Sequence, residues 1–130
     1  MLARAERLCE ERGWENVTLD RQNAEELDVA PGQDAVLFSL SYSVIPQPRR
    51  ALARAWEGLR PGGQIVIMDG GLPGGPLGAI VRPWALALSK ATVRGDLSVR
   101  PWDDLAAYTD HVEIERLQLG TYYICHASKR

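Results

Sequence analysis

The chain has 130 residues, the length of one domain, and its 45% hydrophobic and 25% charged residues are average for a soluble globular protein. A net charge of −2 with scattered Lys and Arg argues against a nucleic-acid-binding face or a polybasic membrane patch. The longest apolar stretch, residues 77–88, is too short to span a bilayer and contains Arg82 and Pro83. We therefore expect one cytoplasmic domain with no membrane span and no nucleic-acid partner, in which Cys9 and Cys125 are reduced.

The first third of the chain predicts a helix, a short strand and a turn. Residues 2–12 carry apolar side chains on one side at helical spacing, and Gly13 is suited to end that helix. Residues 16–19 predict a short strand, and residues 23–27 a turn or a brief helix.

The middle of the chain predicts a βαβ unit. Residues 34–40 and 64–68 are short apolar runs without alternation, which is typical of strands covered on both faces. Pro46 and Pro48 favour a helix start between them, and the PGG sequence at 61–63 ends that helix. The helix should dock on the sheet through an apolar stripe at i, i+3, i+4 and i+7: Leu52, Ala55, Trp56 and Leu59.

The last part of the chain predicts an antiparallel hairpin after an inserted segment. A loop is expected at 70–78, followed by an apolar helix, and residues 102–108 predict a further short helix. Residues 112–119 alternate but slip by one near Glu115, which predicts a strand with a bulge. Residues 122–127 predict the last strand, antiparallel to it.

The chain contains four short elements in a characteristic order: MLARA (1–5), QNAEEL (22–27), DAV (34–36) and LRPGG (59–63). They resemble sequence words at the second helix, third strand, fourth strand and fifth strand of class I S-adenosylmethionine-dependent methyltransferases, most closely the small-molecule, quinone or lipid group. The resemblance implies an α/β, Rossmann-like methyltransferase sheet that is mostly parallel and ends in an antiparallel hairpin.

The resemblance covers the C-terminal two-thirds of the family's domain. The family's glycine-rich cofactor motif, and the acidic residue that binds the ribose, would both precede Met1. We therefore expect one N-terminally truncated domain over 1–130. Two origins remain open: a fragment of a longer enzyme, which we favour, or a natural remnant that has lost ordinary cofactor binding.

The function that the resemblance implies is methyl transfer from S-adenosylmethionine to a small acceptor of hydrophobic character. Without the glycine-rich motif, cofactor binding is expected to be weak or absent. The resemblance identifies residues 70–101 as a substrate-specificity or lid insertion, although hydrophobic helices usually belong to a core. Two alternatives stay open: transfer of the aminocarboxypropyl group from the same cofactor, or a non-catalytic interaction module.

Asn23 and Ala24 are the first candidate cofactor residues. The resemblance implies that Asn23 hydrogen-bonds the adenine amino group and that the Ala24 backbone approaches the adenine ring. Alternatively, Asn23 and Glu26 form the capping box of a short helix, and the two roles are compatible.

Leu40, Ser41 and Tyr42 are the other candidates, because they follow a strand whose carboxyl end should face a ligand. The resemblance implies contact with the methionine part of the cofactor; an ordinary polar loop is the alternative. Asp69 ends the next strand on the same side, where it could orient a substrate or cap the segment that follows.

Other patterns give weaker signals. The glycine-rich residues 70–75 lack the Lys-Ser/Thr of a phosphate-binding loop, and a lid hinge is the better interpretation. His126 and Cys125 are adjacent on a strand and point to opposite faces, so we expect no metal site. The sequence indicates no catalytic residue. In-line positioning of the acceptor against the methyl group of the cofactor could supply most of the rate of methyl transfer.

The missing first strand also predicts assembly. The strand at 34–40 would otherwise have an unpaired apolar edge, which favours aggregation. We therefore expect either that residues 16–19 pair with this strand or that two chains associate across its edge as a homo-oligomer.

Overall fold

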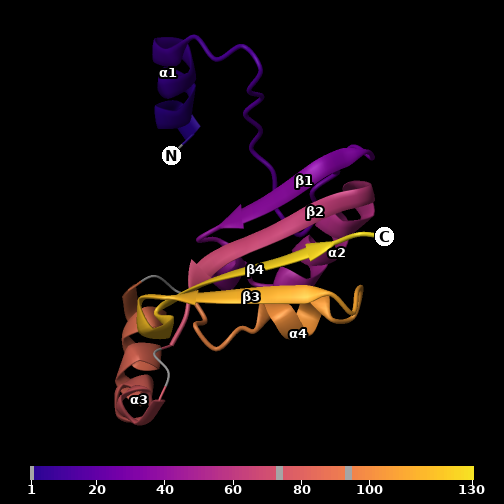
Figure 1. Ribbon diagram of the computed structural model, residues 1–130. Coiled ribbons are helices and arrows are strands. Elements are labelled where there is room, and N and C mark those ends of the chain that lie inside the picture. The colour runs from indigo at the N-terminus through magenta and orange to yellow at the C-terminus, as the bar shows by residue number, and fades with distance from the viewer. Residues whose placement is uncertain (1, 73–74, 93–94) are drawn as a thin grey trace.

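The computed structural model describes residues 2–72, 75–92 and 95–130 (Figure 1). It contains four strands, four α-helices and two short 3₁₀ turns within these residues. In chain order they are α1 (Leu2–Arg12), β1 (Gln33–Ser39), η1 (Tyr42–Val44), α2 (Pro48–Gly58), β2 (Leu59–Gly70), α3 (Gly75–Thr92), α4 (Pro101–Leu105), β3 (Val112–Leu117), η2 (Gln118–Gly120) and β4 (Tyr122–Ser128).

The four strands form one mixed sheet in the order β1-β2-β4-β3. β1 and β2 are parallel and are joined through α2, which confirms the expected βαβ unit. β4 is antiparallel to both β2 and β3, which confirms the C-terminal hairpin. Of the mostly parallel sheet that we expected, the described residues therefore contain one parallel pair, at the β1 side.

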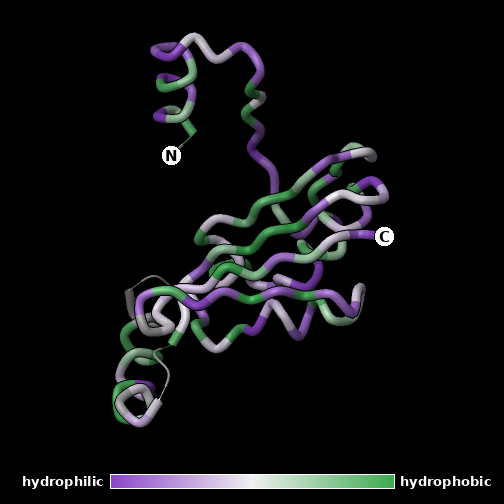
Figure 2. The backbone as a smooth tube through the Cα atoms, viewed as in Figure 1, coloured by the Kyte–Doolittle hydropathy of each residue, from purple (hydrophilic) through white to green (hydrophobic). Residues whose placement is uncertain are grey.

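The core lies on one face of the sheet, where α2 and α4 pack (Figure 1). Hydrophobic residues run along β1 and β2 (Figure 2), and their core-facing side chains meet the apolar stripe of α2. Leu52 and Ala55 are buried there, as the helical spacing predicts, and Leu105 of α4 completes the cluster from the β4 side. The opposite face is open at β1, where the Leu37 side chain is 64% exposed.

The turn between α2 and β2 explains the LRPGG sequence. β1 and β2 slip in register here, from Gln33 opposite Leu59 to Ala35 opposite Gln64. A Cβ on Gly63 would lie 2.9 Å from the backbone oxygens of Arg60 and Gln33, so only glycine lets the strands come this close.

Lys129 caps the C-terminal end of α2. Its Nζ donates to the carbonyl oxygens of Trp56 at 2.7 Å and Leu59 at 2.9 Å, and more weakly to that of Glu57 at 3.3 Å. These carbonyls lie at the negative end of the helix dipole, where a cation is favourable, and Trp56 O also accepts from Leu59 N. The chain end thus ties the sheet to the helix.

Replacing Lys129 with methionine keeps the apolar stem but removes these three hydrogen bonds. We expect the free energy of unfolding, measured by urea denaturation, to fall by about 1–2 kcal/mol. Arg130→Met, at the neighbouring exposed residue, removes the same charge without a cap and should change it by less than about 0.5 kcal/mol. Equal losses in the two variants would refute the cap.

α1 forms as predicted, but it stands apart from the sheet (Figure 1) and none of its residues is buried. Gly13 ends it with φ +64°, and Trp14 N donates to Cys9 O at 3.0 Å, the hydrogen bond of a Schellman cap. The apolar spacing of α1 was therefore correctly read as a helix, although its apolar side lies against no core.

The strand expected at 16–19 is wrong. Asn16 lies in a turn and residues 17–19 have no regular structure, and Val17 and Leu19 are 43% and 36% exposed. β1 pairs only with β2 among the described residues, so the pairing of 16–19 with β1 is wrong as well. A strand needs a neighbour to satisfy its backbone groups, and none lies beside this segment.

Two smaller expectations also change. The bulge near Glu115 is absent, because β3 pairs with β4 in continuous register from Val112 to Leu117. The apparent slip marks the end of the strand, where Gln118 begins η2 with φ +48°. The loop expected at 70–78 is shorter, since β2 reaches Gly70 and α3 starts at Gly75. Residues 73–74 of this loop and Met1 lie outside the described residues.

No helix in the described part of the chain is both long and apolar enough to cross a membrane.

Candidate active site

The carboxyl ends of β1 and β2 lie side by side and are locked together by Asp69. Its carboxylate is 3% exposed and accepts hydrogen bonds from Ser43 N at 2.7 Å, Ser43 Oγ at 3.0 Å and Gly70 N at 2.7 Å. Leu40 N also donates to Met68 O at 2.8 Å. Of the two interpretations of Asp69, the structure favours the cap, because its oxygens are used to hold the loop after β1.

The three predicted residues that follow β1 differ in side-chain exposure: Leu40, Ser41 and Tyr42. Leu40 has φ +48°, rare for a non-glycine residue, and its side chain is 54% exposed at the strand end. Ser41 is half-buried, and Tyr42 is fully buried in the core. Leu40 and Ser41 can therefore meet a ligand, whereas the Tyr42 side chain cannot.

The Tyr42 hydroxyl has a structural partner instead. It donates to Asp104 Oδ2 at 2.9 Å, and Asp104 Oδ1 accepts from Arg49 Nε at 2.7 Å. Burial is the main cause that raises the pKa of Tyr42, and the hydrogen bond and negative charge of Asp104 add to it. Tyr42 is thus a neutral donor that joins η1 to α4.

Asn23 and Ala24 lie in a turn rather than at a helix start, so the capping box with Glu26 is wrong. Asn23 Oδ1 accepts from Glu25 N at 3.2 Å, which is an Asx turn. Glu25 is 8% exposed and accepts from Gln47 N at 3.0 Å, at the residue that precedes α2. This contact holds the Asn23 turn beside the end of the loop that follows β1.

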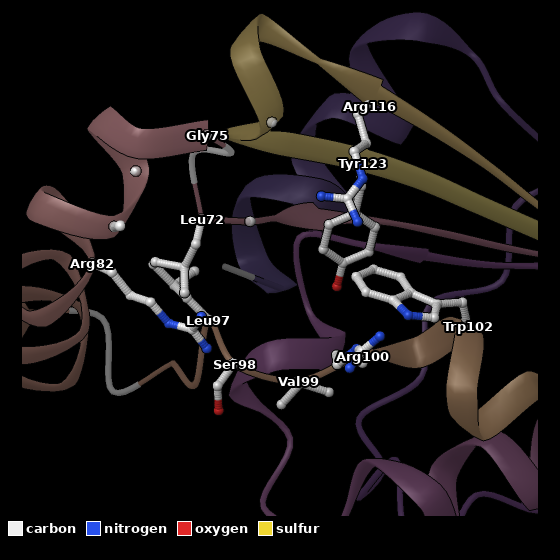
Figure 3. A pocket seen from close by; sticks show the side chains of 14 residues that line it. Leu72, Gly75, Arg82, Leu97, Ser98, Val99, Arg100, Trp102, Arg116 and Tyr123 are labelled. Atoms are coloured by element: carbon white, nitrogen blue, oxygen red, sulfur yellow. The ribbon is translucent and has the colours of Figure 1, made fainter.

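A cavity of about 360 Å³ opens just beyond the carboxyl end of β2 (Figure 3). Its volume lies in the range of small-molecule sites. The segment after β2, helix α3, the segment before α4, and the β3–β4 hairpin all contribute to its wall. The lining residues are Gly71, Leu72, Gly75, Gly78, Ala79, Arg82, Leu97, Ser98, Val99, Arg100, Trp102, Arg116, Gly120 and Tyr123.

The polar side chains that line the cavity are three arginines, Tyr123 and Ser98, whose hydroxyl donates to Asp96 Oδ1. Arg100 and Arg116 each lie 5.5 Å from the Trp102 ring centroid, and the Trp102 and Tyr123 rings meet edge to face at 5.3 Å. Tyr123 is 4% exposed. Burial, and then the charge of Asp69, raise the pKa of Tyr123, so its hydroxyl is a proton donor rather than a base.

Residues 95–99 connect the cavity to the end of β1. Asp96 N donates to Ser43 O at 2.8 Å, and a Cβ on Gly95 would lie 3.3 Å from Val44 Cγ1. Leu97 and Val99, two and four residues past Gly95, line the cavity. The predicted cofactor loop and the cavity are therefore neighbours, although none of the five predicted residues lines the cavity.

Sequence reasoning named none of these residues individually, although ten of the fourteen lie within residues 70–101, the expected specificity or lid insertion. Trp102 was read as the start of a helix and Tyr123 as part of a strand, and both readings are correct. Arg116 sits on β3 and Arg100 just before α4, about sixteen residues apart in the chain. The only available signal was the two-residue period of β4, which places Tyr123 on the same face as Cys125.

The two cysteines and the histidines do not form a metal site. Cys125 is fully buried in the core, while His126 faces the other side and lies 3.7 Å from Glu113. Within the described residues no three side chains of the ligand types His, Cys, Asp and Glu gather. Both cysteines are free.

Solved structures with the same arrangement include several methyltransferases. A protein from Nostoc punctiforme proposed to be an O-methyltransferase superposes with a TM-score of 0.73 at 19% identity, covering 98% of this chain. The N-methyltransferase NodS from Bradyrhizobium japonicum superposes with a TM-score of 0.68 at 16% identity, covering 99% of this chain. An O-methyltransferase family protein from Burkholderia thailandensis gives 0.68 at 16% over 96%.

The fold is that of the class I methyltransferases. This confirms the resemblance seen in the sequence and the Rossmann-like fold class. No protein-family model and no curated protein matches the sequence.

The chain covers only part of these methyltransferases. It spans 41% of the Nostoc structure, 40% of the Burkholderia structure and 69% of NodS. It spans about half of other structures with the same fold, such as a Bacillus halodurans protein at 52%. The cavity lies beyond the carboxyl end of β2, and residues 95–99 link it to the loop after β1.

Proposed function

We propose that this chain takes part in methyl transfer from S-adenosylmethionine to a small acceptor held in the cavity of Figure 3. The observation that carries the proposal is the position of the cavity. It opens at the carboxyl end of β2, directly beside the end of β1, in a chain with a methyltransferase fold. In open α/β sheets, this is the end of the strands where ligands bind.

The residues at the end of β1 fit one side of the cofactor. Leu40 and Val44 expose apolar side chains, 54% and 44%, that would cover the methionine chain, and Ser41 would supply a hydroxyl. Tyr42 would contribute through its position in the loop, since its side chain lies in the core. At the neighbouring turn, the free amide nitrogen of Asn23 and the backbone of Ala24 would approach the adenine.

S-adenosylmethionine supplies an electrophilic methyl group: the acceptor's lone pair forms the new bond, the C–S bond breaks with its electron pair remaining on sulfur, and an acceptor proton leaves to solvent. The chain's own part is positioning. Residues 95–99 would hold acceptor and donor at a common wall, because the same segment touches the β1 loop and lines the cavity. We further propose that residues 70–101, which include α3, act as the specificity and lid insertion.

The proposal predicts measurable cofactor binding. Isothermal titration with S-adenosylmethionine and S-adenosylhomocysteine should give heat at millimolar ligand or below. Leu40→Asp should weaken binding about tenfold or more, since it places a charge against the cofactor's apolar chain. Leu8→Asp makes the same change on α1, at a similarly exposed leucine, and should leave the affinity unchanged.

No heat from either ligand would refute cofactor binding by this chain. The released nucleoside separates the two transfer reactions, because aminocarboxypropyl transfer leaves methylthioadenosine and methyl transfer leaves S-adenosylhomocysteine.

A second candidate function, an interaction module, is favoured by the free edge of β1. This edge and the exposed Leu37 beside it suit pairing with a second copy of the chain, so we propose a homo-oligomer. Light scattering after size exclusion should find a dimer that Leu37→Lys weakens; a monomer at all concentrations would contradict it. The free, buried Cys125 supports a reducing, cytoplasmic location.

A further inference from the structure

The charge of the cavity is one-sided. Three of its fourteen lining residues are arginines, Arg82, Arg100 and Arg116, and none is acidic. They come from three separate parts of the fold, α3, the segment before α4, and β3, and their side chains meet around one space (Figure 3). All three residues are exposed, so water screens their mutual repulsion, but a bound anion would meet three positive charges at once.

Of the three arginines, only Arg100 has a carboxylate partner within the described residues. Arg100 Nε lies 3.1 Å from Asp103 Oδ2, but that pair is exposed, with side-chain exposures of 63% and 54%, and therefore weak. In residues 2–72, 75–92 and 95–130, no carboxylate pairs with Arg82 or Arg116. Arg116 instead lies over the Trp102 ring, which it shares with Arg100.

The Tyr123 hydroxyl is an independent sign of a ligand. It is the one buried side-chain oxygen or nitrogen in the described residues without a hydrogen-bond partner. Its residue is 4% exposed, and the hydroxyl points toward Trp102 within the cavity (Figure 3). An unsatisfied buried hydroxyl costs about 1–3 kcal/mol, which a bound acceptor atom would recover.

The remaining side chains of the wall are apolar except Ser98, whose hydroxyl is bound to Asp96. Leu72, Leu97 and Val99 line it together with the Trp102 indole. A ligand that matches both parts has a flat apolar body and one anionic group. An inorganic anion would contact only the arginines of the cavity, and a neutral apolar molecule would contact only its apolar wall.

We propose that the cavity binds a small aromatic carboxylic acid, whose carboxylate is held by Arg116, Arg100 and Arg82 and accepts a hydrogen bond from the Tyr123 hydroxyl. The aromatic ring lies against Trp102 and the aliphatic wall. Calling this acid the methyl acceptor rests on the proposed function; its binding does not.

Binding is tested with benzoate as the probe, by isothermal titration of the wild-type chain without S-adenosylmethionine. Benzamide has the same shape without the charge, and inorganic phosphate has charge without an apolar body. We expect benzoate to bind at least about tenfold more tightly than either.

Two variants assign the contacts. Arg116→Gln should weaken benzoate about tenfold or more, whereas Arg54→Gln, the same change on the exposed side of α2, should leave it unchanged. Tyr123→Phe should weaken benzoate while keeping or raising the urea midpoint, because it removes an unpartnered hydroxyl. A purely structural tyrosine would lower the midpoint and leave the affinity alone.

Several results would overturn the proposal. Absence of benzoate binding refutes it outright, equal affinities for benzoate and benzamide refute the anion site, and equal affinities for benzoate and phosphate refute the aromatic body. The same preparation is titrated separately with S-adenosylmethionine. Cofactor binding without benzoate binding refutes only this inference, whereas benzoate binding without cofactor binding refutes methyl transfer and keeps the acid site.

Discussion

Replacing Asp69 with alanine is expected to lower the free energy of unfolding by about 3–4 kcal/mol, the larger of two stability effects that the structure predicts. The buried carboxylate accepts three hydrogen bonds, two from Ser43 and one from Gly70. Its loss leaves the backbone N–H of Ser43 buried without an acceptor. Because Ser43 O also holds Asp96 N, the wall of the cavity should loosen together with the loop after β1.

Urea denaturation measures the effect, and Asp34→Ala is its control. Asp34 also pairs with a charged group, Arg60, but its side chain is 83% exposed, so its loss should cost less than about 0.5 kcal/mol. Asp69→Asn keeps the shape and one acceptor oxygen and should fall between the two. Equal costs for the Asp69 and Asp34 variants would show that the cap does not hold the loop.

The second large effect is a loss of stability in alkali that depends on Cys125. Burial raises the pKa of the Cys125 thiol to about 11, from 9.0 in an unfolded chain. Between these values the unfolded chain has lost the proton and the folded chain still binds it, so rising pH favours unfolding. The stabilisation is complete below pH 9 and is lost as the pH rises toward 11, a change of about 2–3 kcal/mol.

Urea denaturation of wild type and Cys125→Ala across pH 9–11 measures this change. In the variant, the free energy of unfolding should fall less steeply with pH. Part of the pH dependence remains because the pKa values of Tyr42 and Tyr123 are also raised from 10.0. Ile67→Val, a non-titrating core change of about 1 kcal/mol, should shift the whole curve but keep its slope. An unchanged slope in Cys125→Ala would mean that the thiol is not desolvated in the folded protein.

The elements with strong local signals could be predicted from the sequence. The stripe Leu52, Ala55 and Leu59 is buried as its helical spacing requires, and the terminal hairpin pairs as its short connection requires. The LRPGG turn follows from glycine's freedom at a close approach of backbones. The helical spacing, the short connection and the glycine turn are local patterns, so they can be recognised from the sequence alone.

Features that depend on distant neighbours were predicted less well. Residues 16–19 have the composition of a strand but have no partner strand, and composition cannot supply one. Tyr42 lies in a loop that was expected to face a ligand. Its ring lies in the core instead, where its hydroxyl donates a hydrogen bond to Asp104 of α4. The contact of Glu25 with Gln47, which holds the turn of Asn23 and Ala24, joins residues far apart in the chain and could not be read from it.

The sequence alone therefore determines the class of the fold: a parallel βαβ unit and an antiparallel hairpin around one core, with the spacing of a methyltransferase. It does so because helix and strand periods and turn residues are local properties. Only the tertiary structure decides the character of the cavity, since Arg82, Arg100 and Arg116 come from three elements and gain a joint charge only when folding brings them together. The same holds for Tyr123, whose hydroxyl becomes a candidate ligand contact because folding buries it without a partner.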